Sequence, residues 1–574
     1  MKTLFTLMLA IFGCMGRIVC ASEVETLVEE LKKTAKPDPG ISTEGQEIAK
    51  KLQAIGAGAI PYLLPLLRDK NEAVRTLTSY VLRDVEGLTE KDLDALIESR
   101  RRGDGWIPPA IATIGTPRAV AFLVEELVRE RETQTQLTWA IKMLGEKAIP
   151  GLVDVFRNEK EWDDKLERTM FFVFQELGDK AVSAIDPLLK IADDGTAPPK
   201  RRIRAITAIG SIGLSAQRAV PNLLRWQKSS DAGIRDAATS AILGIGSPEA
   251  APIFVRMLEQ APDAFRRKLL MRDIAELKER GKSAGATVVK YLADEDWDVR
   301  VGAARALGYI GYAEAADDLI HLLGRQDDWR LVLSAAESLA RLKSERALPA
   351  LSQVFENHWY PPVREAALTA SRAIRDGAPM KPGHSDENFA FEFFAYENAG
   401  EEMESLDARD AKSIRFPVAA GQEQEVTMMT KAKDGTVKRE RIRGVKVEDG
   451  YLAGADRGEW GGEITFIDSK GYAKVIVAAN TEAIYKTDRA IFAVTGLAHI
   501  TMNSGFIFKI AKGAGGEWTA TEWRALPGAP RFSRLLQDGS VFVSCYGGIV
   551  VVSPDGGMKS LSRGESLKPS TPTH

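Results

Sequence analysis

The chain has 574 residues, a formal net charge of −3 and a sequence pI near 6.2. This length allows several domains, and the weak charge balance lacks the basic footprint of a nucleic-acid-binding protein. Short basic clusters at residues 100–102, 200–202 and 266–268 fit solvated helix faces. We therefore expect no nucleic-acid partner.

The first residues have the pattern of a secretory signal. A lysine at position 2 precedes an apolar run at residues 4–12, and Val19-Cys20-Ala21 offers a cleavage site after Ala21. The run is too short to span a bilayer. Cys14, which follows a glycine, gives the alternative of a lipid anchor, and a buried N-terminal helix is a third interpretation. We expect an exported, periplasmic protein without a transmembrane span.

Cysteine usage agrees with export. Of three cysteines, Cys14 and Cys20 lie in the predicted signal, so cleavage leaves Cys545 alone and no internal disulfide is possible. Residues 541–546 alternate like a β-strand. We predict that Cys545 is a buried structural thiol rather than a nucleophile.

A short phrase recurs through the first two thirds of the chain. It reads Ala-Ile-Gly-Ser-Ile-Gly at residues 208–213 and returns at 241–246 and 306–311, with looser copies ending at glycines 115, 145 and 178. From position 115 to position 246 the closing glycines are 30, 33, 35 and 33 residues apart. Self-similarity at this period predicts an α-solenoid.

Each repeat is predicted to contain two amphipathic helices. Behind Asp296, the residues Val299, Ala303, Leu307 and Ile310 follow at helical spacing, and the glycine at position 311 suits the left-handed residue that ends a helix. Ala-x-Pro phrases start the second helices, because proline fits the first helical turn. They stand at residues 59–61, 148–150, 219–221, 250–252 and 347–349.

The phrase from Asp298 to Gly311 resembles the HEAT-repeat family, in the short variety labelled phycobilisome-lyase-like. The resemblance covers roughly residues 45–378. It implies an interaction scaffold rather than lyase activity. It also implies bonds between neighbouring repeats from aspartate and arginine, which here would be Asp298, Arg300, Asp231 and Arg235. The copies around Phe265 and Leu331 lack this arginine, so such a ladder would be interrupted.

A second domain follows the repeats. Helical periodicity stops near residue 376, and Gly/Pro punctuation predicts a linker at 379–388. Short alternating runs then predict an antiparallel β domain at 389–561. Strand–turn–strand phrases ending in Asp-Gly resemble propeller blades. About three blades follow residue 450, and closure needs at least four. Residues 389–447 must therefore supply the rest, or the domain is a sandwich.

The predicted organisation is thus multidomain, with α and β parts in separate regions. A signal peptide occupies residues 1–21, a HEAT-like solenoid 22–378, the linker 379–388 and the β domain 389–561. The remaining residues, 562–574, form a polar tail that we predict to be disordered.

Residues 454–463 form the densest polar cluster of the chain. Glycine lets backbone approach a ligand closely, and a tryptophan with an arginine can stack on a sugar or a peptide. The alternative is a tight inter-strand loop whose charges face water. The candidate ligand-binding residues here are Asp456, Arg457, Glu459, Trp460 and Glu463.

His499 and Asn503, between two predicted strands, extend this candidate site. His499 would act as a base or a ligand if a carboxylate such as Glu459 lay beside it; the alternative is a turn residue satisfied by backbone. The five histidines have no metal-ligand spacing and no cysteine pair exists, so we expect neither a metal nor another cofactor. No phosphate-binding Gly loop with its lysine and no Gly-x-Ser-x-Gly phrase occurs.

Trp297, Trp329 and Trp359 recur at intervals of 32 and 30 residues, before the first helix of successive repeats. They form either an exposed protein-binding stripe or caps on the core between repeats. The repeats favour an exported scaffold that binds a protein or peptide, without evident catalysis. The alternative function is a small-ligand or sugar-binding protein, or a hydrolytic enzyme, with its site in the β domain.

Overall fold

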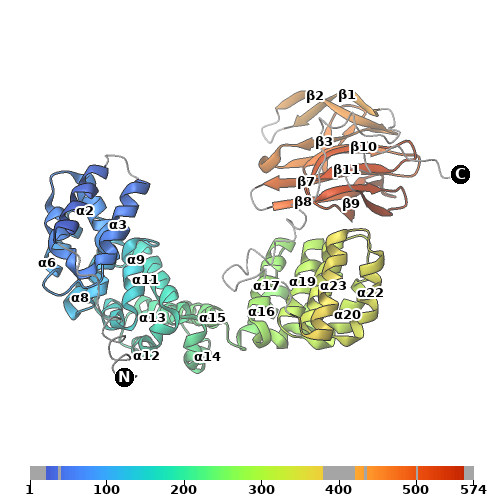
Figure 1. The fold of residues 1–574 in the computed structure, drawn as a ribbon. Helices are drawn as coiled ribbons and strands as arrows, with labels where there is room; N and C mark the ends of the chain where they lie inside the picture. Colours follow the sequence, from blue (N-terminus) through green and yellow to red (C-terminus); the bar gives the residue numbers. More distant parts are fainter. Residues whose placement is uncertain (1–20, 36–40, 379–420, 432–435, 500–501, 562–574) are drawn as a thin grey trace, which may run out of the picture. The chain divides into compact units, whose positions relative to one another are not determined.

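The computed structural model describes residues 21–35, 41–378, 421–431, 436–499 and 502–561 (Figure 1). Residues 1–20 of the predicted signal, the predicted linker and the tail lie outside the described residues. The chain divides into two compact units, Met1–Ala250 and Ala251–His574. This division falls inside the helical array, so the last helix pairs belong to the same unit as the β sheets.

The first unit consists of paired helices joined by short turns, many of them 3₁₀ turns. Its helices are α2 (Ala21–Thr34), α3 (Thr43–Ile55), α4 (Ile60–Leu63), α5 (Glu72–Arg83), α6 (Leu93–Arg101), α7 (Ile107–Ile114), α8 (Pro117–Glu130), α9 (Gln136–Leu144), α10 (Ile149–Asn158), α11 (Asp164–Leu177), α12 (Ile185–Asp193), α13 (Pro199–Ser211), α14 (Val220–Trp226) and α15 (Ala232–Ile245).

Helix α15 shows why these segments are helical. The Asp231 carboxylate accepts the N–H of Ile234 at 3.0 Å and so caps the first turn. Ile234, Ala238 and Ile242 then bury one stripe of the helix. Gly246 ends the helix with φ of 65°, in the left-handed region. The closing glycine of the repeated phrase therefore does what the sequence predicts.

The small residues of the phrase let neighbouring helices approach closely. A Cβ added at Gly210 in α13 would lie 2.6 Å from the Cα of Ala241 in α15. Helix backbones at this separation leave no room for a side chain. The Ala-Ile-Gly pattern is therefore a packing requirement as well as a repeat marker.

The second unit begins with helices of the same kind. They are α16 (Ala250–Glu259), α17 (Ala264–Glu276), α18 (Gly285–Val288), α19 (Trp297–Tyr309), α20 (Ala316–Leu322), α21 (Trp329–Arg341), α22 (Leu348–Asn357) and α23 (Pro361–Asp376). Helices α17, α19, α21 and α23 pack side by side in this order.

The repeat anatomy predicted around Asp296 is confirmed. Val299, Leu307 and Ile310 are fully buried, and Gly311 follows with φ of 66°. Prolines stand in the first turn of the second helices, as in α10, α14 and α22. Within the described parts of the chain, no single helix is long and apolar enough to cross a membrane, and α15 with α16 pass that test only when taken together.

In the β domain, the described residues form three antiparallel sheets of consecutive strands. The first is β1 (Glu423–Lys431), β2 (Val437–Val447), β3 (Gly450–Asp456), β4 (Gly462–Asp468) and β5 (Ala473–Val477). The second is β6 (Thr481–Lys486), β7 (Ile491–His499), β8 (Met502–Lys512) and β9 (Trp518–Ala525). The third is β10 (Pro530–Leu535), β11 (Val541–Cys545), β12 (Gly548–Val552) and β13 (Met558–Leu561).

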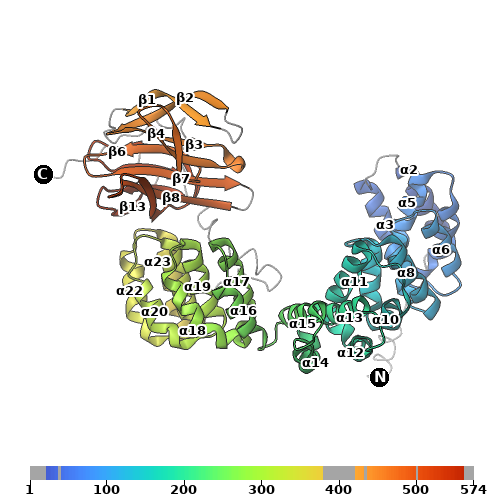
Figure 2. The same ribbon diagram turned by 180° about the vertical axis from the view of Figure 1, so that it is seen from behind.

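The second sheet is the middle layer of the domain (Figures 1 and 2). Ile464 of the first sheet packs with Ile484 and Phe508 of the second, and Val494 on its other face packs with Val543 of the third. The antiparallel β domain is confirmed over its described residues, from 421 to 561. The second and third sheets have four consecutive strands, as a propeller blade does, and the first has five; the described residues form these three sheets and no closed propeller.

Candidate functional site

The polar loop predicted from residues 454–463 connects β3 to β4 and contains a short 3₁₀ turn, η13 (Gly458–Trp460). Asn480 holds this turn: its Oδ1 accepts the N–H of Arg457 at 3.3 Å, and its Nδ2 donates to the carbonyl of Gly458 at 2.8 Å. The Asp456 carboxylate accepts the Gly458 N–H at 2.9 Å. Arg457 forms an ion pair with Glu463, with 3.0 Å between Nη1 and Oε1. The loop is therefore ordered by its own polar groups.

His499 and Glu459 lie side by side, as the functional interpretation of the histidine requires. His499 Nε2 is 3.2 Å from Glu459 Oε2, and both side chains are partly exposed. Trp460, next in the loop, is 83% exposed. A ring this accessible can stack on a ligand at little cost.

Asn503 lies apart from this group. It is the cross-strand partner of Ala498 rather than of His499, and neighbouring residues of a strand face opposite sides of the sheet. Its Oδ1 accepts the N–H of Ala529 at 2.8 Å. The structure therefore brings together the predicted residues of the β3–β4 loop and His499, but not Asn503. Among the described residues, no cluster of histidine, cysteine or carboxylate side chains fits a metal ion.

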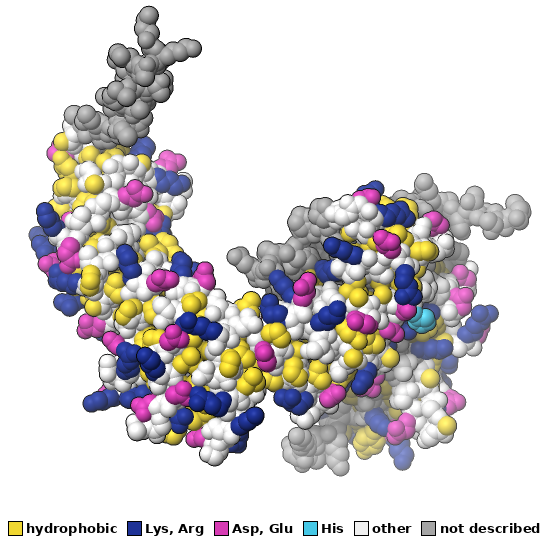
Figure 3. All heavy atoms as spheres, turned by 90° about the horizontal axis from the view of Figure 1, so that it is seen from below, with side chains coloured by type: hydrophobic (Ala, Val, Ile, Leu, Met, Phe, Trp, Pro, Cys, Tyr) yellow, Lys and Arg dark blue, Asp and Glu magenta, His cyan; other side chains and the backbone are white. Residues whose placement is uncertain are grey.

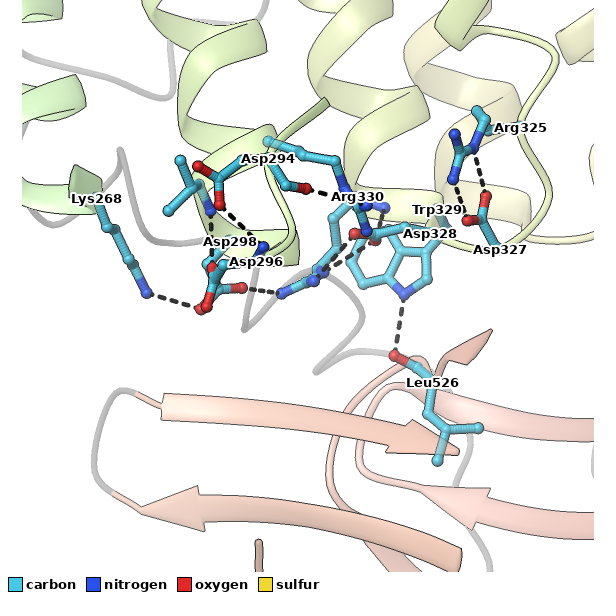
Figure 4. Close-up of polar contacts among 12 residues, drawn as sticks. Lys268, Asp294, Asp296, Asp298, Arg325, Asp327, Asp328, Trp329, Arg330 and Leu526 are labelled. Atoms are coloured by element: carbon cyan, nitrogen blue, oxygen red, sulfur yellow. Dashed lines mark hydrogen bonds and ion pairs between the residues drawn. The ribbon is translucent and has the colours of Figure 1, made fainter. Parts of the chain in front are cut away.

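Trp297 and Trp329 stand at the first position of α19 and α21, and they face the β domain of the same chain. Trp329 is 2% exposed, and its indole N–H donates to the carbonyl of Leu526 at 2.9 Å (Figure 4). The Trp297 ring meets the edge of the Phe506 ring at 6.0 Å between centroids. Part of the predicted stripe is thus covered by the chain itself.

Trp359 packs against the core between the second and third sheets, and its neighbour Tyr360 completes the contact. The Tyr360 hydroxyl donates to the carbonyl of Gly547 at 3.2 Å, and the ring lies 4.8 Å from that of Trp329. A protein-binding role for the three tryptophans stays a prediction. We call this contact the seam; it is made by Trp297, Asp327, Trp329 and Tyr360 against Phe506, Ala525, Leu526 and Gly547.

Charged side chains line the helical edge of the seam. Asp298 accepts from Lys268 at 3.1 Å and from Arg330 at 2.7 Å, so it connects α17, α19 and α21 (Figure 4). Burial alone would raise the pKa of Asp298, but Arg330 and Lys268 outweigh burial and hold the pKa at about 2. The bond between neighbouring repeats that the resemblance implies for Asp298 is therefore present.

Arg330 is the buried centre of this cluster. Its Nε and Nη2 each donate to a carboxylate oxygen of Asp328 at 3.0 Å, and the guanidinium lies 4.8 Å from the centroid of the Phe506 ring. Burial opposes its charge, but Asp328 and Asp298 raise the pKa of Arg330 above its ordinary value. Arg330 therefore stays charged and links the repeats to the β domain.

The other three residues expected in the ladder bond to their own helix or to the loop that directly precedes it. Arg300 donates to the carbonyl of Asp294 at 3.3 Å, and Arg235 donates to the carbonyls of Ser229 and Ser230 at 2.8 Å. Asp231 caps its own helix. The reason is geometric, because a helical side chain points back toward the N-terminus and so reaches the preceding loop.

Glu522 on β9 is a residue that sequence reasoning missed. Burial raises its pKa to about 7; attraction to Arg330 lowers it, whereas Asp296, Asp298 and Asp328 raise it further. No local motif marks this strand residue. On the helical side of the seam, by contrast, the sequence does carry a signal, because the Asp-Trp dipeptide at residues 296–297 is repeated at 328–329.

The first unit carries a different aromatic surface, on α5, at the residue just before α7 and on α9. The Arg83 guanidinium lies 4.6 Å from the ring centroid of Tyr80, 5.3 Å from that of Trp106 and 6.0 Å from that of Trp139. Trp139 is 42% exposed and Met143, one turn further along α9, is 40% exposed. We call these five residues the aromatic face.

A groove of about 540 Å³ lies between α6 and α8 of the same unit. Its lining mixes apolar side chains with charges of both signs. The lining residues are Asp94, Ile97, Glu98, Arg101, Arg102, Arg118, Ala121, Phe122 and Glu125. Figure 3 likewise shows Lys/Arg and Asp/Glu side chains interspersed with apolar ones on the visible face, without an extended field of one sign.

The stacked helix pairs define the class of fold, an α-solenoid with a β domain. Residues 185–272 and 285–372 match the family model of HEAT repeats. The helical part of the chain is therefore a HEAT-repeat solenoid, a fold typical of protein-interaction scaffolds. A comparison with curated protein sequences found no match.

Three solved structures show the range of likeness. The complex of CpcE and CpcF of phycocyanin lyase from Nostoc sp. PCC7120 is 19% identical over 44% of this chain and 94% of that chain, with a TM-score of 0.23. Human deoxyhypusine hydroxylase is 17% identical over 46% and 97%, with a TM-score of 0.20. Importin beta is 14% identical over 66% and 58%, with a TM-score of 0.35. At these values the likeness carries no information on ligand or activity.

Proposed function

We propose that this protein is an exported interaction scaffold whose first unit binds a protein or peptide through the aromatic face. The observation that carries the proposal is the exposure of Trp139 and Met143 beside the ring cluster around Arg83, on helices of a repeat fold suited to binding. Exposed tryptophan and methionine next to an arginine are the side chains enriched at protein interfaces.

The surface suits a partner with an apolar side chain flanked by polar groups. Arg83 is bonded to Asp84, with 2.9 Å between Nε and Oδ2, so the cation is neutralised locally. On α9, Lys142 pairs with Glu176 of α11 at 2.8 Å. The face therefore offers apolar area with a polar rim rather than a charged field.

Site-specific crosslinking tests this proposal. A photoreactive phenylalanine analogue replaces Trp139 in one protein and Asp154, which is 57% exposed on α10, in the control. The proposal expects one discrete crosslinked partner from position 139, none from position 154, and loss of the first product when Met143→Ala is added. Equal crosslinking from both positions in folded proteins would contradict it.

Export is a separate part of the proposal, supported by the pattern of residues 1–21. Intact mass of the protein purified from its native cell distinguishes the alternatives. A mature chain starting at Ser22 supports secretion, one starting at a lipid-modified Cys14 supports anchoring, and an uncleaved Met1 contradicts both.

The pair of Glu459 with His499 beside the exposed Trp460 favours a second candidate function, small-ligand or sugar binding at the β3–β4 loop. A carboxylate–imidazole pair can also move a proton in hydrolysis. Glycan-array binding that is lost in Trp460→Ala and in His499→Ala would support it. Binding that persists in both variants would place the ligand elsewhere.

A further inference from the structure

We propose that the groove between α6 and α8 is a second binding site, which takes a short peptide segment with an acidic and a basic side chain on either side of an apolar one. The two helices lie next to each other in both ribbon views (Figures 1 and 2). The groove measures about 540 Å³, within the usual range for ligand sites. It lies on other helices than the aromatic face, so this inference goes beyond the proposed function and does not depend on it.

Ion pairs hold the two walls of the groove together near both ends. Where the helices begin, Arg118 of α8 is bonded to Asp94 of α6. Where α6 ends, Arg100 pairs with Glu126 of α8, with 3.2 Å between Nε and Oε2, and also with Glu130. The side chains of Arg100 and Glu126 are only 11% and 6% exposed. The groove is therefore formed before a ligand arrives, which lowers the cost of ordering on binding.

Most of the charged residues that line the groove are paired within the protein. Arg102 donates from Nη1 to the Glu98 carboxylate and from Nη2 to the carbonyl of Leu67, both at 2.7 Å. Arg118 and Asp94 already neutralise each other. These four lining charges stabilise the walls, so they leave no net charge for a ligand to meet.

Two lining charges remain, one on each wall. Among the described residues, Arg101 of α6 has no carboxylate partner and Glu125 of α8 has no cationic partner. Both residues are exposed. The Arg101 guanidinium lies over the Phe122 ring, 5.9 Å from its centroid. A guanidinium placed over an aromatic ring keeps N–H donors free for a carboxylate.

The chemistry of the occupant follows from charge complementarity. A carboxylate suits Arg101, whose planar fork binds both carboxylate oxygens, and an ammonium or guanidinium group suits Glu125. One turn before each charge the lining is apolar, with Ile97 on α6 and Ala121 on α8, so an aliphatic side chain fits between the charged ones. A wholly acidic segment would meet Glu125 with a like charge, and a wholly basic one would meet Arg101, so the groove selects a segment of mixed charge.

Phage-displayed random peptides, selected on the whole protein and then measured by fluorescence anisotropy, test the proposal. We expect a set of peptides in which an acidic and a basic residue flank an apolar one. Their Kd should rise on the order of tenfold in Arg101→Gln and in Glu125→Gln, because each change removes one charged partner. Arg157→Gln is the matched control, since Arg157 is 47% exposed on α10, paired with Asp154 and outside the groove; it should bind these peptides like the wild type.

A charge exchange makes the test sharper. Arg101→Glu should reject these peptides and bind the versions whose acidic residue is replaced by lysine. Circular dichroism checks that the variants are folded, and Glu125→Gln decides if a variant at position 101 is not. The proposal is overturned if no selected peptide depends on Arg101 or Glu125, or if Arg101→Glu keeps the wild-type charge preference. Peptides weakened only by Trp139→Ala would support the aromatic face and count against the groove, so the two sites are distinguished.

Discussion

Trp329 donates its indole N–H to the carbonyl of Leu526, a residue 197 positions later in the chain. Around this bond, repeat helices and β sheets share one buried surface, with Tyr360 and Phe506 as its other aromatic members. The last repeats and the β domain therefore contribute to each other's stability.

Trp329→Phe removes the donor and leaves the Leu526 carbonyl unpaired in a buried place. We expect it to lower the free energy of unfolding of the second unit by about 1–2 kcal/mol, and Trp329→Ala to lower it by about 3–5 kcal/mol. Urea denaturation followed by circular dichroism measures both. Trp460→Ala, at an 83% exposed position, is the control and should change little. Indistinguishable midpoints for all three variants would refute the buried role.

Asp298 gives a pH-dependent contribution to stability. Its pKa is held at about 2, below the ordinary 3.8, so its contribution is present above pH 4 and is lost as the pH falls toward 2. Its side chain is 35% exposed, and solvent screening limits the contribution to about 1–2 kcal/mol. Asp298→Asn should lose that much at pH 7 and show a shallower acid decline in urea titrations. Asp186→Asn, at a 67% exposed position, should match the wild type.

Gly210→Ala tests the close approach of α13 and α15. The added methyl group would lie 2.6 Å from the Cα of Ala241, which is backbone and cannot move aside cheaply. We expect a loss of about 1–3 kcal/mol from overpacking, seen as a lower thermal midpoint by calorimetry. Gly195→Ala is the control, since nothing lies within 4 Å of a Cβ there. A neutral Gly210→Ala would mean that the helices separate without cost.

Cys545 should be unreactive in the folded protein. It is fully buried in β11, and burial raises the pKa of its thiol far above the ordinary value. Titration of a protein that begins at Ser22, and so lacks Cys14 and Cys20, with a thiol-reactive chromogen should give almost no signal until denaturant is added. Trp460→Cys supplies an exposed thiol as the positive control. Rapid labelling of native Cys545 would contradict its place in the core.

The helical repeats were predictable because their signals are local. One short segment contains the Asp296 cap, the buried stripe that follows it and the glycine at position 311. Each of these signals indicates a helix start, a helix face or a helix end by itself. The buried strand around Cys545 was predictable for the same reason. Whether the β sheets close into a propeller could not be predicted, because closure depends on how sheets that are distant in sequence pack against one another.

The polar contacts were harder to predict. The sequence suggested a role for His499 only if Glu459 lay beside it. It could not predict the 3.2 Å contact between them, because the two residues are forty positions apart in the chain. Asn503 does not join His499 as predicted, because neighbouring residues of a strand face opposite sides of the sheet and Asn503 pairs with Ala498. Glu522 and Arg330 gave no signal at all, because their importance arises only where two remote segments meet.

The seam also determines how the protein can be divided for expression. The Gly/Pro-rich stretch after α23 looks like the natural place to cut, yet a fragment ending there would leave Trp329 and Tyr360 bare, and its counterpart would lose the cover on Phe506 and Leu526. Both pieces would tend to self-associate. Cleavage near Ala250, between the compact units, keeps this surface intact and is the sounder design for producing soluble fragments.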